Sequence, residues 1–178
     1  MRSQAQIYGL IAASGVLDRL AAFDPHWVGS TALDVHVTGS DVDICCTAHG
    51  DLNAFEASLR KTFGKEPNFK VKREQYRGKA SCLAIFSIAD QFVEIYGRAH
   101  PVAEHEFYQL FVVEQRLLRF GGEALQGQVR DLKFDDFTTE QAFGRALGLG
   151  DDPEAALLEL LEAPATDYLS LLSKADFA

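Results

Sequence analysis

The chain has 178 residues, of which 47% are hydrophobic, and its formal net charge of -9 comes from 26 acidic against 17 basic residues. This length and composition support a globular core with an appended helical piece, and the acidic balance disfavours nucleic acid as a partner unless a local basic patch is present. No apolar run approaches the roughly 20 residues that span a bilayer, no signal peptide opens the chain, and the three cysteines form no C-x-x-C motif, so we expect a soluble cytoplasmic protein.

The first third of the chain is expected to mix helices with short strands. Apolar residues at helical spacing predict a helix over 4–22, which ends before Pro25 because proline disfavours helix at the preceding residue. Short strands are expected at 26–29 and 41–47. A second helix is expected over 51–63, where four large apolar side chains share one stripe.

Three further strands are expected at 69–77, 80–88 and 91–96. Only two residues connect each to the next, which is typical of tight antiparallel turns. The first half of the chain therefore predicts a mixed sheet crossed by one helix.

The second half is expected to be helical. An apolar helix over 103–120 is broken by Gly121-Gly122, and a shorter helix follows to about Lys133. Thr138 and Gln141 form a capping box at the start of another helix. Pro153 stands at the first position of a further helix, where its missing N–H is not needed. The chain thus divides into an α+β core, residues 1–100, and a helical region, residues 101–178, which we expect to pack together as one folding unit.

Two aspartates, Asp41 and Asp43, stand one residue apart at the start of an apolar run. In a strand they point to the same face, with Val42 and Ile44 turned into the core. Neighbouring carboxylates repel each other unless a cation lies between them, and hard divalent ions take carboxylate oxygens together with substrate phosphate oxygens. The pair therefore predicts a two-metal platform for in-line phosphoryl or nucleotidyl displacement, although the same pattern also marks turns and solvated strand ends.

Glu94 stands alone among the apolar residues of the expected strand Q-F-V-E-I-Y. A lone charge there is costly unless it is paired or binds metal. Two interpretations stay open, a third metal ligand or a salt bridge to Arg98, Lys72 or Arg73.

Phosphate-binding residues are expected in two places. Gly29 lets the backbone approach a phosphate closely, while adjacent N–H groups and the hydroxyl of Ser30 can bind its oxygens. Basic residues cluster between positions 61 and 79, where Arg73 is a candidate, and Arg98 follows the Glu94 strand. A solvated strand face is the alternative interpretation of the basic cluster.

The succession V-G-S at 28–30, D-V-D-I at 41–44 and a later strand acid, Glu94, resembles the DNA polymerase β-like nucleotidyltransferase superfamily. Over nearly the whole chain, the sequence is similar to a small bacterial nucleotidyltransferase-like family of unknown function. That similarity extends through V-E-I-Y-G, A-E-H-E-F-Y-Q-L-F-V-V-E-Q-R-L-L and T-T-E-Q-A-F-G-R-A-L-G-L. The resemblance implies an α+β fold, with a nucleotidyltransferase-like mixed β-sheet, flanking helices and a C-terminal helical half.

The resemblance also implies an enzyme that transfers a nucleoside monophosphate from an NTP to an acceptor hydroxyl, with Mg²⁺ or alternatively Mn²⁺. Asp41, Asp43 and Glu94 are then the catalytic and metal-binding carboxylates, and Gly29 and Ser30 hold the β- and γ-phosphates. We expect a small molecule or a protein as acceptor rather than nucleic acid, and no membrane partner.

Two features depart from the superfamily's usual pattern. Thr31-Ala32-Leu33-Asp34 stands where many small members place a basic residue, and the third acid is glutamate instead of the commoner aspartate. The first departure favours an alternative, a catalytically silent nucleotide-sensing or partner-binding module of the toxin–antitoxin type. A metal-dependent phosphohydrolase is a weaker alternative, because it normally brings regularly spaced histidine ligands.

Overall fold

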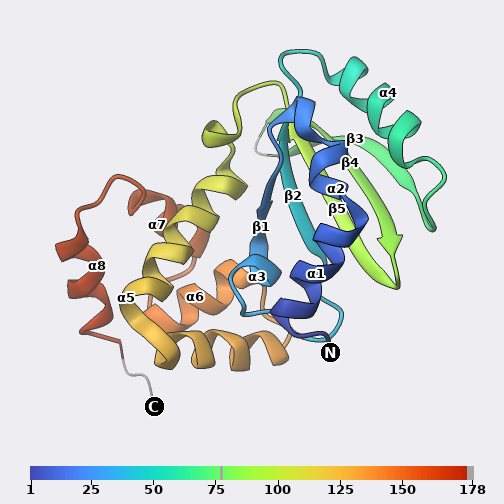
Figure 1. The fold of residues 1–178 in the computed structure, drawn as a ribbon. Helices are drawn as coiled ribbons and strands as arrows, with labels where there is room; N and C mark the ends of the chain where they lie inside the picture. The colour runs from blue at the N-terminus through green and yellow to red at the C-terminus, as the bar shows by residue number, and fades with distance from the viewer. Residues whose placement is uncertain (77, 176–178) are drawn as a thin grey trace. The chain divides into compact units, whose positions relative to one another are not determined.

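The computed structural model describes residues 1–76 and 78–175, so Arg77, at the end of one expected strand, lies outside them. The chain divides into two compact units. The first consists of Met1–Ala32 and Gly39–His105, and the second of Leu33–Thr38 and Glu106–Ala178. Figure 1 shows the sheet of the first unit and the helices of the second.

The N-terminal helical segment of the first unit is broken into pieces. They are α1 (Gln4–Ser14), α2 (Val16–Arg19) and the 3₁₀ turn η1 (Ala21–Phe23). The prediction of one helix over 4–22 was wrong, because Gly15 takes a left-handed φ of 61° and ends α1. The apolar stripe still reaches the core, where these side chains are buried: Ile7, Ile11, Val16 and Leu20.

A five-stranded mixed sheet forms the centre of the first unit, in the order β1-β2-β5-β4-β3. The strands are β1 (His26–Val28), β2 (Val42–Thr47), β3 (Lys70–Tyr76), β4 (Lys79–Ile88) and β5 (Gln91–Arg98). Strands β2 and β5 run parallel, and all other neighbours are antiparallel. Ala89 and Asp90 both have positive φ, at 45° and 63°, as in a type I′ hairpin. The tight turn expected between β4 and β5 is confirmed.

Helix α4 (Leu52–Phe63) packs against one face of this sheet. The carboxylate of Asp51 caps it by accepting from the backbone N–H groups of Asn53 and Ala54. Its buried side chains share a core with alternate residues of the strands, namely Phe55, Leu59 and Phe63 with Val42, Ile44, Cys46, Val93 and Ile95. Strand alternation then places Asp43 and Glu94 on the opposite face of the sheet.

Gly97 in β5 leaves room for a ring of α4. A Cβ at this position would lie 2.1 Å from Cε1 of Phe55. We expect Gly97→Ala to destabilise the protein by about 2–3 kcal/mol through overpacking, measured by urea denaturation. In a Phe55→Leu background, Gly97→Ala should lower the free energy of unfolding by less than it does in wild type, because the smaller side chain leaves room for the methyl group. An equal cost in both backgrounds would contradict this explanation.

The second unit is built mainly from helices. They are α5 (Glu106–Phe134), α6 (Thr139–Leu147), α7 (Pro153–Glu159) and α8 (Ala165–Leu172), while the 3₁₀ turn η2 (Val102–Glu104) precedes them in the first unit. Helix α5 is kinked at Gly122, where φ is 62° and ψ is -155°, so the expected break is confirmed. The capping box at Thr138 and the position of Pro153 are confirmed as well. Helix α8, which follows Pro164, was not predicted.

Leu33–Thr38 belongs to the second unit although it lies far from the rest of that unit in sequence. Leu33 and Val35 are buried in its apolar core. Nε2 of Gln126 donates to the backbone oxygen of Asp34 at 3.2 Å, and Arg130 donates to the same oxygen. The simple division at residue 100 did not foresee this segment, and folding as one unit stays a prediction.

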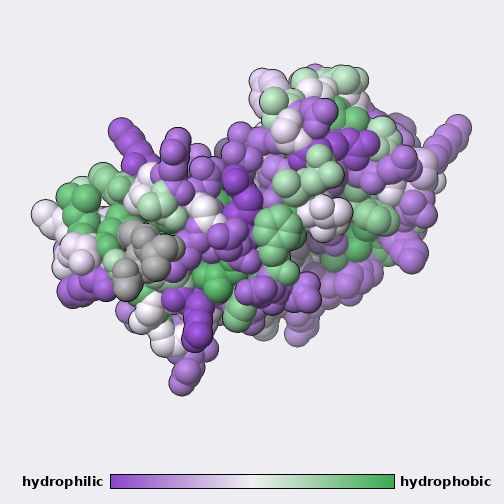
Figure 2. Space-filling model, turned by 90° about the horizontal axis from the view of Figure 1, so that it is seen from below, coloured by the Kyte–Doolittle hydropathy of each residue, from purple (hydrophilic) through white to green (hydrophobic). Residues whose placement is uncertain are grey.

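The face of the molecule drawn in Figure 2 is mostly hydrophilic, with hydrophobic residues in small groups. This agrees with the excess of acidic residues in the sequence. Among the described residues, no helix combines the length and the apolar character needed to cross a membrane.

Candidate active site

The predicted acids lie close together on the sheet. Asp43 of β2 is the register partner of Glu94 of the parallel strand β5, so both side chains leave the same face. Asp41 lies just before β2, and its negative charge acts on Glu94. The structure therefore brings the three carboxylates into one neighbourhood, on the face that α4 does not cover.

Gly29 lies directly against Asp43. It begins the one-turn helix α3 (Gly29–Ala32) immediately after β1. Its φ is 74°, and a Cβ on it would lie 2.3 Å from Oδ2 of Asp43. Both the left-handed backbone and the close approach require glycine here. Ser30 follows and is buried, so the turn predicted to bind phosphate adjoins one of the predicted metal ligands.

The contact with Asp43 can be separated from the backbone effect by comparing two glycines. Gly39 also has a left-handed φ, 93°, but a Cβ there would meet no atom of the described residues within 4 Å. We expect Gly39→Ala to cost about 1 kcal/mol from the backbone alone. Gly29→Ala should cost at least about 1 kcal/mol more, because Asp43 must move as well. Thermal denaturation of both variants tests this, and equal costs would contradict the steric role of Gly29.

Two of the carboxylates, Asp41 and Glu94, lie in an environment that disfavours their charged forms. Burial raises the pKa of Asp41. Burial, and after it the negative charge of Asp41, raises the pKa of Glu94, against an opposing effect of Lys72. The thiol of Cys45 lies on the same face, and burial and then Asp43 raise its pKa to about 12. A cation or a proton at this site would relieve the repulsion between the acids.

The two arginines predicted to bind phosphate lie on different faces of the sheet. Arg73 lies on the other face of the sheet, where its Nε is 2.7 Å from Oε2 of Glu56 and its Nη2 donates to Asn53 at 2.9 Å. Arg98 shares the face of Glu94, four residues further along β5, and its charge acts on Cys45 together with that of Asp43. It is 1% exposed, and its Nε donates to the hydroxyl of Tyr96.

Two lysines of β3, and not Arg73, lie on the same face of the sheet as the acids. Lys70 pairs with Ile85, which in turn pairs with Glu94, so all three point to the acid face. Lys72 lies on that face too and forms an ion pair of 2.9 Å with Glu74. Alternation along the strand separates these lysines from Arg73, but the sequence does not say which face α4 covers.

The donor set is chemically suited to magnesium, although the side chains do not form a finished cage. Within residues 1–76 and 78–175, no three His, Cys, Asp or Glu side chains are arranged to hold a metal ion. Magnesium is usually held by one or two carboxylates and completes its shell with substrate phosphates and water. Asp41 and Asp43, with their mutually crowded neighbour Glu94, fit that mode of binding.

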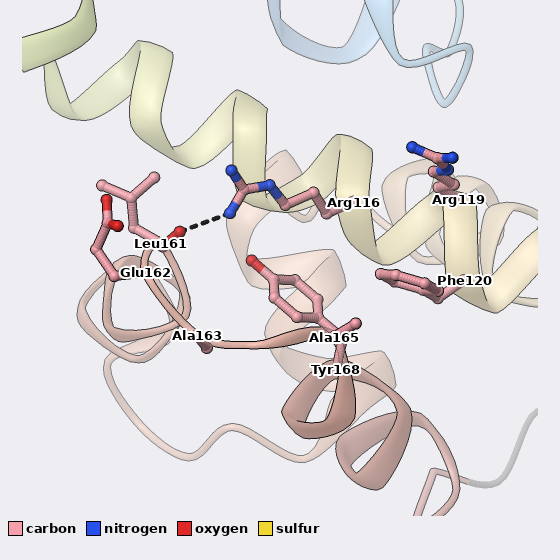
Figure 3. A pocket seen from close by; sticks show the side chains of 8 residues that line it. All are labelled: Arg116, Arg119, Phe120, Leu161, Glu162, Ala163, Ala165 and Tyr168. Atoms are coloured by element: carbon pink, nitrogen blue, oxygen red, sulfur yellow. Dashed lines mark hydrogen bonds between the residues drawn. The ribbon is translucent and has the colours of Figure 1, made fainter.

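A separate cavity of about 420 Å³ lies in the second unit and contains none of the predicted site residues (Figure 3). Nη1 of Arg116 donates to the backbone oxygen of Leu161 at 2.6 Å across it. The ring of Phe120 and the side chain of Tyr168 form part of its wall. Glu162 also lines this cavity, so its charge is mixed.

Solved structures with a similar fold include a poly(U) polymerase, an RNA terminal U-transferase and the GLD-2/RNP-8 complex. The Cid1 poly(U) polymerase with bound MgGTP has a TM-score of 0.52 and 13% identity, over 72% of this chain and 40% of its own. A cytoplasmic RNA terminal U-transferase has a TM-score of 0.50 and 14% identity, over 70% of this chain and 38% of its own. The GLD-2/RNP-8 complex has a TM-score of 0.52 and 12% identity, over 98% of this chain and 67% of that one.

The chain therefore has a nucleotidyltransferase-like fold, as the sequence predicted. It spans less than half the length of the Cid1 and U-transferase chains that it matches. The model of the family described as "Domain of unknown function (DUF4269)" matches residues 9–160, and the chain belongs to this family. No curated protein matches it.

Proposed function

We propose that this protein is a metal-dependent nucleotidyltransferase that transfers a nucleoside monophosphate from an NTP to an acceptor hydroxyl. The observation that carries the proposal is the juxtaposition of Gly29, Asp43 and Glu94. Gly29 touches Asp43, and Asp43 is the register partner of Glu94. This arrangement of the turn and the two acids supports binding of a triphosphate at Gly29-Ser30, with the carboxylates facing the reacting phosphorus.

In the proposed reaction, the acceptor oxygen forms a bond to the α-phosphorus while the bond from that phosphorus to the bridging oxygen breaks. Pyrophosphate leaves with the electron pair, and the acceptor's proton passes to the carboxylate of Glu94. The raised pKa of Glu94 suits it to accept a proton. Backbone N–H groups at Gly29 and Ser30 would orient the β- and γ-phosphates.

Asp41 and Asp43 would hold the divalent ion, with Glu94 beside them. When bound, Mg²⁺ or Mn²⁺ supplies positive charge against the phosphate oxygens and aligns the entering and leaving groups. Arg73 has no part in this proposal, because Glu56 and Asn53 hold it on the other face.

The test measures NTP binding and turnover separately. Calorimetry with ATP, GTP, CTP and UTP should detect binding in Mg²⁺ that is lost in EDTA. Pyrophosphate release, assayed with a panel of hydroxyl acceptors, should fall about 100-fold or more in Asp43→Asn, since charge stabilisation at a transferred phosphate is worth at least that much. The control Arg73→Gln should leave both measurements unchanged.

Metal-independent NTP binding, or full activity in Asp43→Asn, would refute the proposed site. Metal-dependent binding without any transfer would point to a nucleotide-sensing module instead.

A further inference from the structure

One row of residues crosses, from end to end, the face of the sheet that α4 does not cover. The register partners are Val28, Asp43, Glu94, Ile85 and Lys70, one from each strand. Gly29 follows Val28 at one end of the row, so the phosphate-binding turn and Lys70 lie at opposite ends, with the acids between them.

The part of the row beyond Glu94 offers an apolar floor with basic groups at its far side. Ile85 is partly exposed between Glu94 and Lys70, and Phe92, on the same face, is 46% exposed. Lys70 is exposed, and the side chain of Lys72 is 60% exposed. The α-carbons of Glu94 and Lys70 stand two strand spacings apart, which is about 10 Å.

Displacement at phosphorus places the entering and leaving groups in line. If the triphosphate lies at Gly29-Ser30, pyrophosphate departs toward β1, and the acceptor hydroxyl must approach from the side of β4 and β3. Resting on the proposed function, we infer that Lys70 and Lys72 bind an anionic group of the acceptor, while Ile85 supports its carbon skeleton. The acceptor is then a small molecule with a hydroxyl and a phosphate or carboxylate about one sugar ring apart.

The charges on this face favour a small anion over a polyanion. Glu74 lies 2.9 Å from Lys72, and Glu94 and Asp43 continue the same surface. With two lysines among these acids and a net charge of -9 for the chain, a nucleic acid strand would meet as much repulsion as attraction. One phosphate or carboxylate can lie against Lys70 and Lys72 without extending over Asp43 and Glu94, so it meets less repulsion than a strand does, with Glu74 competing for Lys72.

The test locates anion binding by NMR in the full chain. Inorganic phosphate and, separately, acetate are titrated at constant ionic strength into wild type, Lys70→Gln/Lys72→Gln and the charge-matched control Lys61→Gln/Lys65→Gln. We expect phosphate or acetate to shift the Ile85 methyl and Lys70 amide signals in wild type and control. Those shifts should fall at least tenfold in the Lys70→Gln/Lys72→Gln variant. The relative size of the phosphate and acetate shifts distinguishes the two anion types.

Shifts confined to Gly29 and Ser30, or unchanged by Lys70→Gln/Lys72→Gln, would overturn the inference. A parallel titration with ATP and Mg²⁺ should give the same affinity in wild type and this variant, and a tenfold loss would assign the lysines to the triphosphate instead. Tighter binding of a single-stranded RNA oligonucleotide at Ile85 would overturn the small-molecule assignment. If wild type binds no NTP, both the proposed function and the acceptor assignment are overturned. If wild type binds NTP but phosphate does not shift the Ile85 and Lys70 signals, only the acceptor assignment is overturned.

Discussion

Asp41→Asn is expected to raise the melting temperature of the metal-free protein and to abolish its stabilisation by NTP with Mg²⁺. In wild type, ligand at 100 times its dissociation constant should stabilise the fold by about 2.7 kcal/mol, or about 5–10 °C for a chain of this size. The variant should show almost none of this gain, because one of the two proposed metal ligands is gone. Differential scanning fluorimetry with EDTA, Mg²⁺ and Mg²⁺ plus NTP measures both effects.

The rise in the metal-free protein follows from repulsion between Asp41 and Glu94. The folded pKa of Glu94 is raised, so its contribution to stability is present below its ordinary value of 4.5 and is lost as pH rises through the folded pKa. Removing Asp41 should reduce that loss and should also remove the loss due to its own raised pKa, so the gain of the variant should grow as pH rises above the ordinary values of the two groups, 3.8 for Asp41 and 4.5 for Glu94. Asp18→Asn, at an exposed position of α2, is the control. A lower melting temperature of Asp41→Asn in EDTA would mark Asp41 as structural.

The features that sequence predicted well are local ones. Alternation placed Val42 and Ile44 in the core, because side chains two residues apart share a face in any strand. Thr138 caps its helix as predicted, since a cap needs only a side chain and the next turn. The break in the first helix was missed because apolar spacing continues across Gly15.

The features that sequence could not supply depend on the order of the strands. That Glu94 lies beside Asp43 follows from the parallel pairing of β5 with β2, between residues about fifty positions apart. The Asp-x-Asp pattern alone cannot give this pairing, which was suggested by the isolated charge of Glu94 and by the family resemblance. Whether Arg73 or Lys70 shares a face with the acids likewise depends on which face of β3 lies under α4.

The segment around Asp34 shows the same limit. Its partners Gln126 and Arg130 stand 92 and 96 residues away in sequence. Nothing in the residues around Asp34 distinguishes a loop of the first unit from a piece of the second.

Glu114 is a buried acid that the predicted site does not use. It lies on α5 inside the second unit, is 2% exposed, and its Oε1 has no hydrogen-bond partner among the residues that the structure describes. Burial, and after it the negative charge of Glu140, raises its pKa well above the ordinary value, with Lys133 opposing and Glu154 adding to the effect. The carboxyl group is therefore held in its neutral form over a wider pH range in the folded chain than in the unfolded one.

We expect the stability of wild type to fall as pH rises from 4.5 toward the folded pKa of Glu114, because over that range the unfolded chain has lost the proton and the folded chain keeps it. One such group contributes a slope of about 1.4 kcal/mol per pH unit. Glu114→Gln, which cannot ionise, should be nearly as stable as wild type at pH 4.5 and increasingly more stable above it. Urea denaturation at several pH values measures the difference, with Glu123→Gln, at an exposed position of the same helix, as the control. If the difference between wild type and Glu114→Gln stays constant with pH, or if the Glu123→Gln control shows the same slope, the raised pKa of Glu114 is not the cause.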